Sequence, residues 1–256
     1  MSEIHPRPVA LITGSARRLG AALACHLHQQ GMDLVLHYQH SGEAAEQLQA
    51  ELLAQRGDSV RLVQADLSQP AQVRQLAARA LQCFGRLDVL INNASQFFAT
   101  PLASAQDDQW EPLFNTNVRA PYILAQSLAD SLREQQGCII NITDIYAERP
   151  LPDFSLYSAC KAALVSLTQS LALELAPDVR VNAIAPGAIL WPDSAMVPAE
   201  SEEAETAHQQ KILARIALSR RGDPSDIARA AWYLIHEAPY VTGQVLRIDG
   251  GRSLSM

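Results

Sequence analysis

The sequence predicts an α/β fold, in which a Rossmann-like, doubly wound parallel sheet forms a single domain over residues 1–256. Short runs of β-branched residues and leucine alternate with longer segments of helical periodicity, which is typical of repeated βαβ units. Several of the short runs are apolar throughout, as expected for parallel strands that helices cover on both faces. Because 48% of the 256 residues are hydrophobic, the chain can bury one substantial core.

The strands are expected in seven runs that share this apolar character: 9–13, 34–37, 60–64, 89–91, 138–142, 179–184 and 244–248. Between the first two runs, Leu19, Leu23 and Leu27 follow one another at a spacing of four and predict an amphipathic helix. Residues 191–215 break the alternation, because they contain two prolines and a cluster of acidic residues. This segment is expected to be a mobile flap over a site, followed by a helix; a plain surface insertion is the alternative.

The composition argues against several classes of protein. A net charge of −7 without any basic block argues against nucleic acid as the main partner. The four cysteines stand alone, without the spacing of a metal site, which favours reduced thiols in a cytoplasmic protein. The first residues lack the features of a signal peptide, and no apolar run reaches the length of a membrane span, so no membrane association is expected.

A glycine-containing loop follows the first expected strand and opens the first helix. Such a loop points backbone N–H groups and the positive end of the helix at a pyrophosphate, although an ordinary turn also contains glycine. With Gly14 and Gly20, the loop resembles that of the short-chain dehydrogenase/reductase family, which reads TGxxxGxG. Arg18 replaces the middle glycine, as in the pteridine reductase and dihydromonapterin reductase branch, where this arginine contacts both cofactor and pterin. Arg17 and Leu19 are expected to contact the cofactor as well.

The residues after the second strand indicate which nicotinamide cofactor is used. An NAD site usually places an acidic residue there to hold the ribose hydroxyls. Here the segment 37–41 contains no acid, so that Ser41, His40 and Arg17 can donate hydrogen bonds to the 2′-phosphate of NADPH. A polar loop without a phosphate role is the alternative. The HYxxS string resembles the NADP site of pteridine reductases, which adds His37 and Tyr38. The family resemblance assigns five further residues to the cofactor: Asp66, Asn93, Ala94, Pro186 and Gly187.

Tyr157 and Lys161 form a YxxxK pair whose spacing places both side chains on one face of a helix. A free phenol has a pKa near 10, and a neighbouring ammonium together with the oxidised cofactor is expected to bring it closer to working pH. By the resemblance, Asn117 completes a proton relay. Where the family normally has a serine, 13 residues before the tyrosine, this chain has Asp144; Thr143 is one residue away and is a possible substitute.

Asp144 points to the substrate. An ionised carboxylate does not donate a hydrogen bond to a carbonyl, but it suits a C=N bond whose nitrogen becomes protonated. A carboxylate that only caps the turn after the strand is the alternative. Ser95 and Phe97 also resemble pteridine reductases, in which an aromatic ring sandwiches the flat pterin against the nicotinamide. The expected substrate residues are Arg18, Ser95, Phe97, Asp144 and Tyr157, and the expected substrate is a dihydropteridine of the dihydrobiopterin, dihydromonapterin or dihydrofolate type.

Two other functions remain open at this point. The chain could reduce a carbonyl group, such as that of a 3-oxoacyl thioester, although Asp144 argues against this. It could also be a non-catalytic NADPH-binding sensor, but such a protein has no need of Tyr157, Lys161 and Asn117 together. The segment 157–176 is apolar or small on most of its faces and predicts a homotetramer paired through this helix, as is usual in the family.

Overall fold

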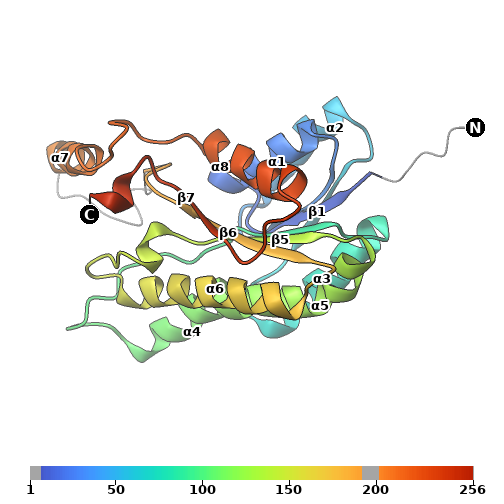
Figure 1. Ribbon diagram of the computed structural model, residues 1–256, viewed down its shortest axis with the longest axis horizontal. Coiled ribbons are helices and arrows are strands. Elements are labelled where there is room, and N and C mark those ends of the chain that lie inside the picture. The colour runs from blue at the N-terminus through green and yellow to red at the C-terminus, as the bar shows by residue number, and fades with distance from the viewer. Residues whose placement is uncertain (1–6, 192–201, 256) are drawn as a thin grey trace, which may run out of the picture.

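The protein is described by a computed structural model that covers residues 7–191 and 202–255. Its centre is one sheet of seven parallel strands in the order β3-β2-β1-β4-β5-β6-β7 (Figure 1). The strands are β1 (Val9–Ile12), β2 (Asp33–Tyr38), β3 (Val60–Gln64), β4 (Val89–Asn92), β5 (Cys138–Ile142), β6 (Arg180–Pro186) and β7 (Val245–Ile248). All seven predicted strands are therefore confirmed, and so is the Rossmann-like fold class.

Helices cover both faces of the sheet. One layer contains α1 (Arg18–Gln29), α2 (Gly42–Gln55) and α8 (Pro224–Trp232), and the other contains α3 (Pro70–Phe84), α4 (Trp110–Phe114), α5 (Ala120–Glu134) and α6 (Ser155–Glu174) (Figure 1). Successive strand residues feed opposite layers, because side chains alternate across a strand. Leu11 and Val35 pack in the cluster that includes α3 and α5, whereas Ile12 and Leu36 pack in the cluster that includes α1 and α8.

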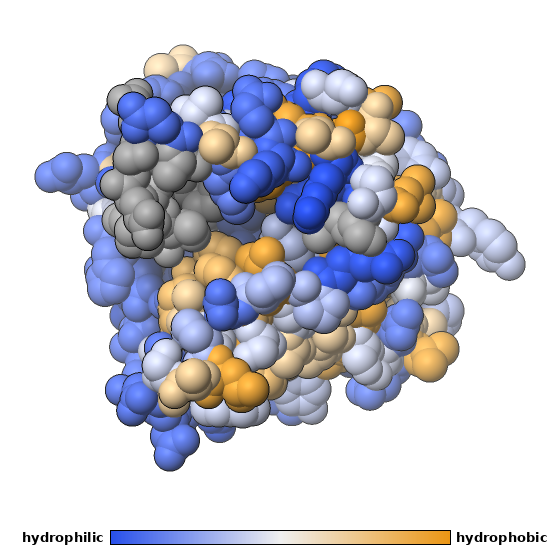
Figure 2. Space-filling view, turned by 90° about the vertical axis from the view of Figure 1, so that its left-hand side faces the viewer, coloured by the Kyte–Doolittle hydropathy of each residue, from blue (hydrophilic) through white to orange (hydrophobic). Residues whose placement is uncertain are grey.

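The carboxyl ends of all strands meet at one edge of the sheet, where the strand order changes direction between β1 and β4. In doubly wound sheets this reversal opens a crevice for ligands, because the loops on its two sides run to opposite faces. Figure 2 looks onto this edge and shows a hollow with hydrophilic side chains above it and hydrophobic side chains below. The fold thus places the loops after β1, β4 and β5 around one hollow.

The segment that broke the strand–helix alternation ends in a helix, as predicted, which is α7 (Glu202–Leu213). The first part of the expected flap, residues 192–201, lies outside the described residues. Among the helices that the structure describes, none combines the length and apolar character needed to cross a membrane.

Candidate active site

A cavity of about 1350 Å³ lies at the carboxyl edge of the sheet. The loops after β1, β2, β4, β5 and β6 line it, together with α7 and Arg252 near the chain's end. Most predicted site residues face this cavity: Gly14, Arg17, Arg18, Leu19, Gly20, His37, Tyr38, His40, Ser41, Asn93, Ala94, Ser95, Phe97, Asp144, Tyr157, Lys161, Pro186 and Gly187. Residues that are far apart in the sequence are therefore brought to one place.

Two predicted residues are not part of the cavity wall. Asp66 accepts a hydrogen bond from the backbone N–H of Ser68 at 2.9 Å and so holds the turn after β3. Asn117 is 1% exposed and lies in a π-helical turn, Asn115–Arg119, between α4 and α5. Its amide donates to the carbonyl oxygens of Gln96 and Leu113, and its Oδ1 accepts from Ser95 at 2.6 Å. Through these hydrogen bonds Asn117 holds Ser95 and the loop after β4 in place, although it does not itself line the cavity.

His37 anchors the glycine loop. The backbone N–H of Gly14 donates to His37 Nδ1 at 3.0 Å, and His37 Nε2 lies 3.1 Å from the carbonyl oxygen of Ala65. Since Nδ1 is the acceptor, Nε2 carries the proton and donates it to Ala65. Burial lowers the pKa of His37 to about 4, so the ring is neutral at physiological pH. Gly14 itself has a φ of +62°, and a Cβ there would lie 2.9 Å from Ala94 Cα, so only glycine fits.

Arg18 has a φ of +55°, a left-handed conformation that favours glycine. The family loop has glycine at this position, which explains why the backbone is shaped in this way. The guanidinium of Arg18 donates from Nη2 to the carbonyl oxygen of Trp191 at 2.8 Å. Arg18 therefore connects the glycine loop with the segment that follows β6, across the mouth of the cavity.

The start of α6 and the end of β5 bring the predicted catalytic side chains together. Tyr157 Oη donates to Asp144 Oδ2 at 2.8 Å, and Asp144 Oδ1 accepts from the backbone N–H of Tyr146 at 2.9 Å. One helical turn after Tyr157, Lys161 Nζ donates to the carbonyl oxygen of Ile142 at 3.0 Å. Its ammonium lies 5.6 Å from the centre of the Tyr157 ring.

The surroundings of Tyr157 within the chain act against the shift expected from the ammonium and the oxidised cofactor together. Burial and then the Asp144 carboxylate raise the pKa of Tyr157 well above its ordinary value. Burial also raises the pKa of Asp144 and lowers that of Lys161 to about 8. Desolvation thus outweighs the attraction between the charges. As a result, Tyr157 keeps its proton at neutral pH and donates it in the hydrogen bond to Asp144.

Thr143 does not take the place of the family's serine. Its hydroxyl donates to the carbonyl oxygen of Ile184 at 2.9 Å. Because a hydroxyl has only one proton, it cannot donate to a substrate at the same time. The side chain at the serine position is therefore the Asp144 carboxylate alone.

Phe97 forms part of an aromatic wall. Its ring stacks on Phe154 with centroids 4.6 Å apart and planes 13° apart. The same ring meets Tyr157 edge-on at 4.7 Å. Phe97 is thereby fixed beside the Tyr157 phenol, and all three rings line the cavity.

Sequence reasoning missed several residues of the cavity, above all Tyr146, Phe154, Arg252 and the α7 residues His208 and Lys211. Phe154 could have been found from its place three residues before Tyr157. Arg252 directly follows the Asp-Gly-Gly string at the end of the family resemblance, but no pattern showed that this end returns to the site.

Known proteins resemble this chain over nearly its whole length. A family described as enoyl-(acyl carrier protein) reductase matches residues 14–253. Pteridine reductase 1 from Leishmania tarentolae is 35% identical, over 100% of this chain and 99% of its own. A 3-oxoacyl-[acyl-carrier-protein] reductase from Synechocystis sp. is 34% identical, over 95% of this chain and 96% of its own. These two identities do not favour one substrate over the other.

A solved structure shares the fold as well as the sequence. The blue fluorescent protein from a metagenomic library, in complex with NADPH, has a TM-score of 0.86 and 37% identity, covering 96% of this chain and 97% of its own. These matches agree with the glycine loop, the YxxxK pair and the sheet order described above. The chain therefore belongs to the short-chain dehydrogenase/reductase family.

Proposed function

We propose that this oxidoreductase uses NADPH to reduce a ring C=N bond of a dihydropteridine to the tetrahydro form. The observation that carries the proposal is the hydrogen bond between Tyr157 and the buried carboxyl group of Asp144, at 2.8 Å. A ketone reductase needs a neutral donor beside the tyrosine, yet the Ser95 hydroxyl donates to Asn117 and the Thr143 hydroxyl donates to the backbone. The site therefore offers one phenol and one carboxyl group, which suits a substrate whose nitrogen takes up a proton.

The residues of the cavity fit NADPH. The glycine loop presents backbone N–H groups at the start of α1, and Gly14 lets this loop pack against Ala94, which any Cβ would prevent. After β2 the wall carries His40 and Ser41 and no carboxylate, so a 2′-phosphate meets hydrogen-bond donors there and the cation of Arg17. NADPH, when bound, supplies the hydride for the reduction.

The chain's own residues supply the proton and the geometry. Tyr157 holds the proton that passes from Oη to the ring nitrogen, and its raised pKa keeps that proton in place until it is transferred. The negative charge then remaining on the Tyr157–Asp144 pair faces the ammonium of Lys161. Phe97, held by its stacking on Phe154, offers an aromatic surface beside Tyr157 against which a flat ring can lie.

The 3-oxoacyl reductase relative of nearly equal identity supports a second candidate function, the reduction of a 3-oxoacyl thioester. The two functions can be separated by following NADPH oxidation with dihydrobiopterin, dihydrofolate and an acetoacetyl thioester. We expect turnover of a dihydropteridine or dihydrofolate, and a loss of about a hundredfold in Asp144→Ser. Reduction of the thioester alone by the unmodified enzyme would replace our proposal with the second candidate.

We also propose a homotetramer paired through α6. Leu164 and Leu171 of this helix face the interior, but Leu173 is 83% exposed on the opposite side. An apolar surface of this kind is covered when helices of two subunits pack together. Light scattering at micromolar concentration should give a tetrameric mass, and Leu173→Glu should lower it. A monomeric mass of the unmodified protein would contradict this assembly.

A further inference from the structure

Arg252 is a buried cation that has no ion-pair partner among the residues that the structure describes. The residue is 6% exposed, and its guanidinium donates from Nη2 to the Tyr146 hydroxyl at 3.0 Å. No carboxylate in the described part of the chain lies within 4.0 Å of it, and its buried Nε has no hydrogen-bond acceptor. Burying a charge costs several kcal/mol unless a partner of opposite charge compensates it. Because Arg252 lines the cavity, a ligand can provide that compensation.

The cavity as a whole is cationic, although the chain is acidic. Among its described lining residues are seven lysines and arginines but only two carboxylates, Asp144 and Glu148, while the chain has 20 basic and 27 acidic residues. Glu148 is already paired with Arg247, outside the cavity wall. Low-dielectric walls concentrate such a field and attract anions into a cleft. The acidic residues of this protein therefore lie mostly elsewhere, and the cavity attracts negative charge.

The exposed and loop cations of the cavity come from two sets of chain segments. Arg17 and Arg18 belong to the glycine loop, where the cofactor phosphates are proposed to bind. Arg149, Lys211 and Arg215 come from the segment after β5 and from α7 with the turn that follows it, and all three are exposed. These three are not needed for the cofactor phosphates, and they add positive charge to the cavity wall.

Arg252 lies close to the proposed reaction centre. The Tyr146 hydroxyl accepts from Arg252, and the Tyr146 backbone N–H donates to Asp144, so one residue separates the cation from the catalytic carboxyl group. The guanidinium carbon also lies 5.5 Å from the centre of the Tyr146 ring. A substrate ring beside Asp144 and Tyr157 thus has a desolvated guanidinium nearby, on the far side of Tyr146 from Asp144.

We propose that the substrate carries a carboxylate or phosphate on the substituent of its ring, and that Arg252 binds this anionic group. Arg149, Lys211 and Arg215 guide the group toward Arg252 and hold any further charge of the same tail. The inference rests on the proposed function in placing the ring beside Asp144, and it names the class of dihydropteridine that the site prefers. Dihydrofolate and dihydropterin phosphate esters belong to this class, whereas dihydrobiopterin has an uncharged side chain.

The test is a comparison of binding in the NADP⁺-loaded protein, in which no turnover takes place. Dissociation constants are measured for dihydrofolate, a dihydropterin phosphate ester and dihydrobiopterin, with the unmodified chain and with Arg252→Met. We expect the variant to bind the anionic ligands about tenfold more weakly, as for a lost hydrogen bond to a charged group, and dihydrobiopterin almost unchanged. The anionic ligand whose affinity falls more in Arg252→Met identifies the preferred anion: dihydrofolate indicates a carboxylate and the dihydropterin ester a phosphate.

Three variants separate anion binding from a structural role. Arg252→Lys keeps the charge and should restore part of the affinity for the anionic ligands. Arg133→Met removes an exposed arginine of α5 that pairs with Asp130, and should change nothing. If Arg252 only supports Tyr146 and Asp144, then Arg252→Met and Tyr146→Phe will shift all ligands equally, which overturns the inference. Failure of both anionic ligands to bind the unmodified protein also overturns it.

Measurements of turnover separate the failure of this inference from the failure of the proposed function. If NADPH oxidation shows no reduction of any dihydropteridine, the proposed function fails, but Arg252-dependent binding of the anionic ligands still establishes the anion subsite. If dihydrobiopterin is reduced as efficiently as its anionic counterparts and Arg252→Met leaves their ratio unchanged, the reaction stands and the subsite does not.

Discussion

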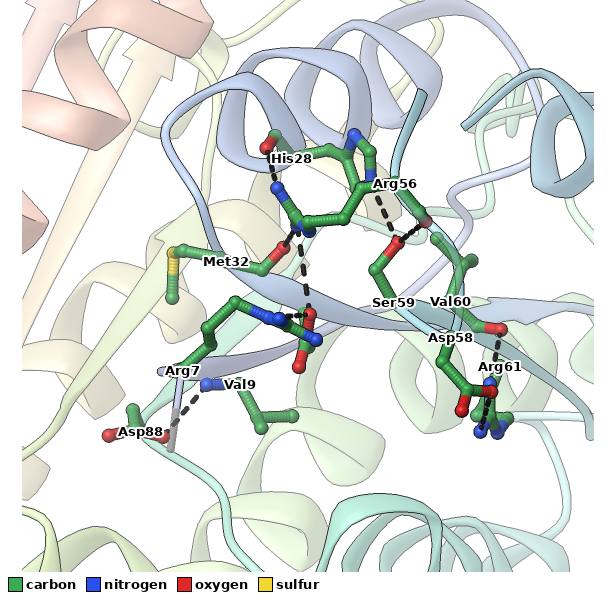
Figure 3. Close-up of polar contacts among 11 residues, drawn as sticks. Arg7, Val9, His28, Met32, Arg56, Asp58, Ser59, Val60, Arg61 and Asp88 are labelled. Atoms are coloured by element: carbon green, nitrogen blue, oxygen red, sulfur yellow. Dashed lines mark hydrogen bonds and ion pairs between the residues drawn. The ribbon is translucent and has the colours of Figure 1, made fainter. Parts of the chain in front are cut away.

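At the amino end of β2 a buried charge is paired, whereas at the carboxyl edge the buried Arg252 has no carboxylate partner among the described residues. Asp33, at the start of β2, accepts a hydrogen bond from Arg7 at 2.8 Å and lies 3.7 Å from Arg56 (Figure 3). Arg56 also donates to the carbonyl oxygens of His28 and Met32, which closes the turn between α1 and β2. Across the sheet, Arg252 is more deeply buried than Arg56 and has no carboxylate partner among the described residues.

This difference indicates that the charges at the amino edge stabilise the fold, whereas those at the carboxyl edge are available to bind a ligand. A buried charge with its counter-charge in the same chain holds the fold together, and little is gained by adding a ligand. A buried charge without one is retained where a ligand completes it, and shifted pKa values gather at such places. Asp144, Tyr157 and Lys161, whose pKa values burial shifts, lie together at the carboxyl edge. Variants at the two edges should therefore fail in different ways.

The largest effect is expected at the carboxyl edge, for Tyr157→Phe. Loss of the proton donor should lower kcat by about a hundredfold to ten-thousandfold, while NADPH binding and the melting temperature stay nearly unchanged. Steady-state kinetics, NADPH fluorescence and thermal unfolding measure the three quantities. Tyr122→Phe, at a half-exposed position of α5, serves as the control. Near-normal turnover of Tyr157→Phe would mean that another group donates the proton.

His37 is expected to make the carboxyl edge sensitive to acid. Burial lowers its pKa to about 4 in the folded chain, against 6.5 for an ordinary histidine. Between these values the unfolded chain binds the extra proton, so stability falls as the pH drops from about 6.5 and the loss is complete below about 4. For this one group the loss amounts to about 3 kcal/mol.

Denaturant unfolding at pH 7, 5.5 and 4.5 tests this expectation. His37→Gln keeps a donor near the Ala65 carbonyl but no longer titrates, so its stability should change less with pH than that of the unmodified protein. His236→Gln replaces an exposed histidine and should keep the original slope. Equal slopes for His37→Gln and the unmodified protein would show that His37 is protonated in the folded chain as well.

A smaller effect is expected for Ser41→Asp, which concerns only the choice of cofactor. A carboxylate at the start of α2 repels a 2′-phosphate and can hold ribose hydroxyls instead. The ratio of kcat/KM for NADPH to that for NADH should therefore fall by at least about tenfold, as expected when like charges are brought together. The unmodified enzyme should prefer NADPH. Equal efficiency with both cofactors before the substitution would contradict the role given to this loop.

The smallest effect on catalysis is expected at the amino edge. Asp33→Asn removes the negative charge between Arg7 and Arg56 and should cost about 1–2 kcal/mol, which lowers the melting temperature by a few degrees. Values of kcat and KM should not change. Asp58→Asn is the matched control in the same region, because Asp58 is 92% exposed in its pair with Arg61 and such pairs contribute little (Figure 3). A kinetic effect of Asp33→Asn would break the division between the two edges.

The fold could be predicted because its strands are continuous apolar runs. The bounds of β3 and β5 agree with the predicted runs, and those of β2 and β6 extend further. Asp33 joins β2 because it pairs with Val9, and Pro186 joins β6 because it pairs with Ile248. Pairing partners come from distant segments, so hydrophobicity alone does not show where such a strand ends.

The candidate site could be predicted only where a local spacing carried the chemistry. Tyr157 and Lys161 were found because they are one helical turn apart, and Asp144 because it takes the place of a family serine. The part of the Tyr157 pKa shift that burial causes could not be predicted, because burial is a property of the folded chain. Arg252 was missed because 108 residues separate it from Asp144, and the π-helical turn at Asn117 gave no recognised signal.

Arg18 has a consequence for attempts to engineer this protein. Its left-handed backbone costs about 1 kcal/mol that glycine would not have to bear, so Arg18→Gly removes strain from the folded chain. A screen that rewards heat resistance alone would accept this exchange. The surviving variants would lose the link from the glycine loop to Trp191 and a cation at the cavity mouth. Directed evolution of this protein should therefore select for turnover in every round, because thermal stability favours glycine at position 18 whereas activity favours arginine.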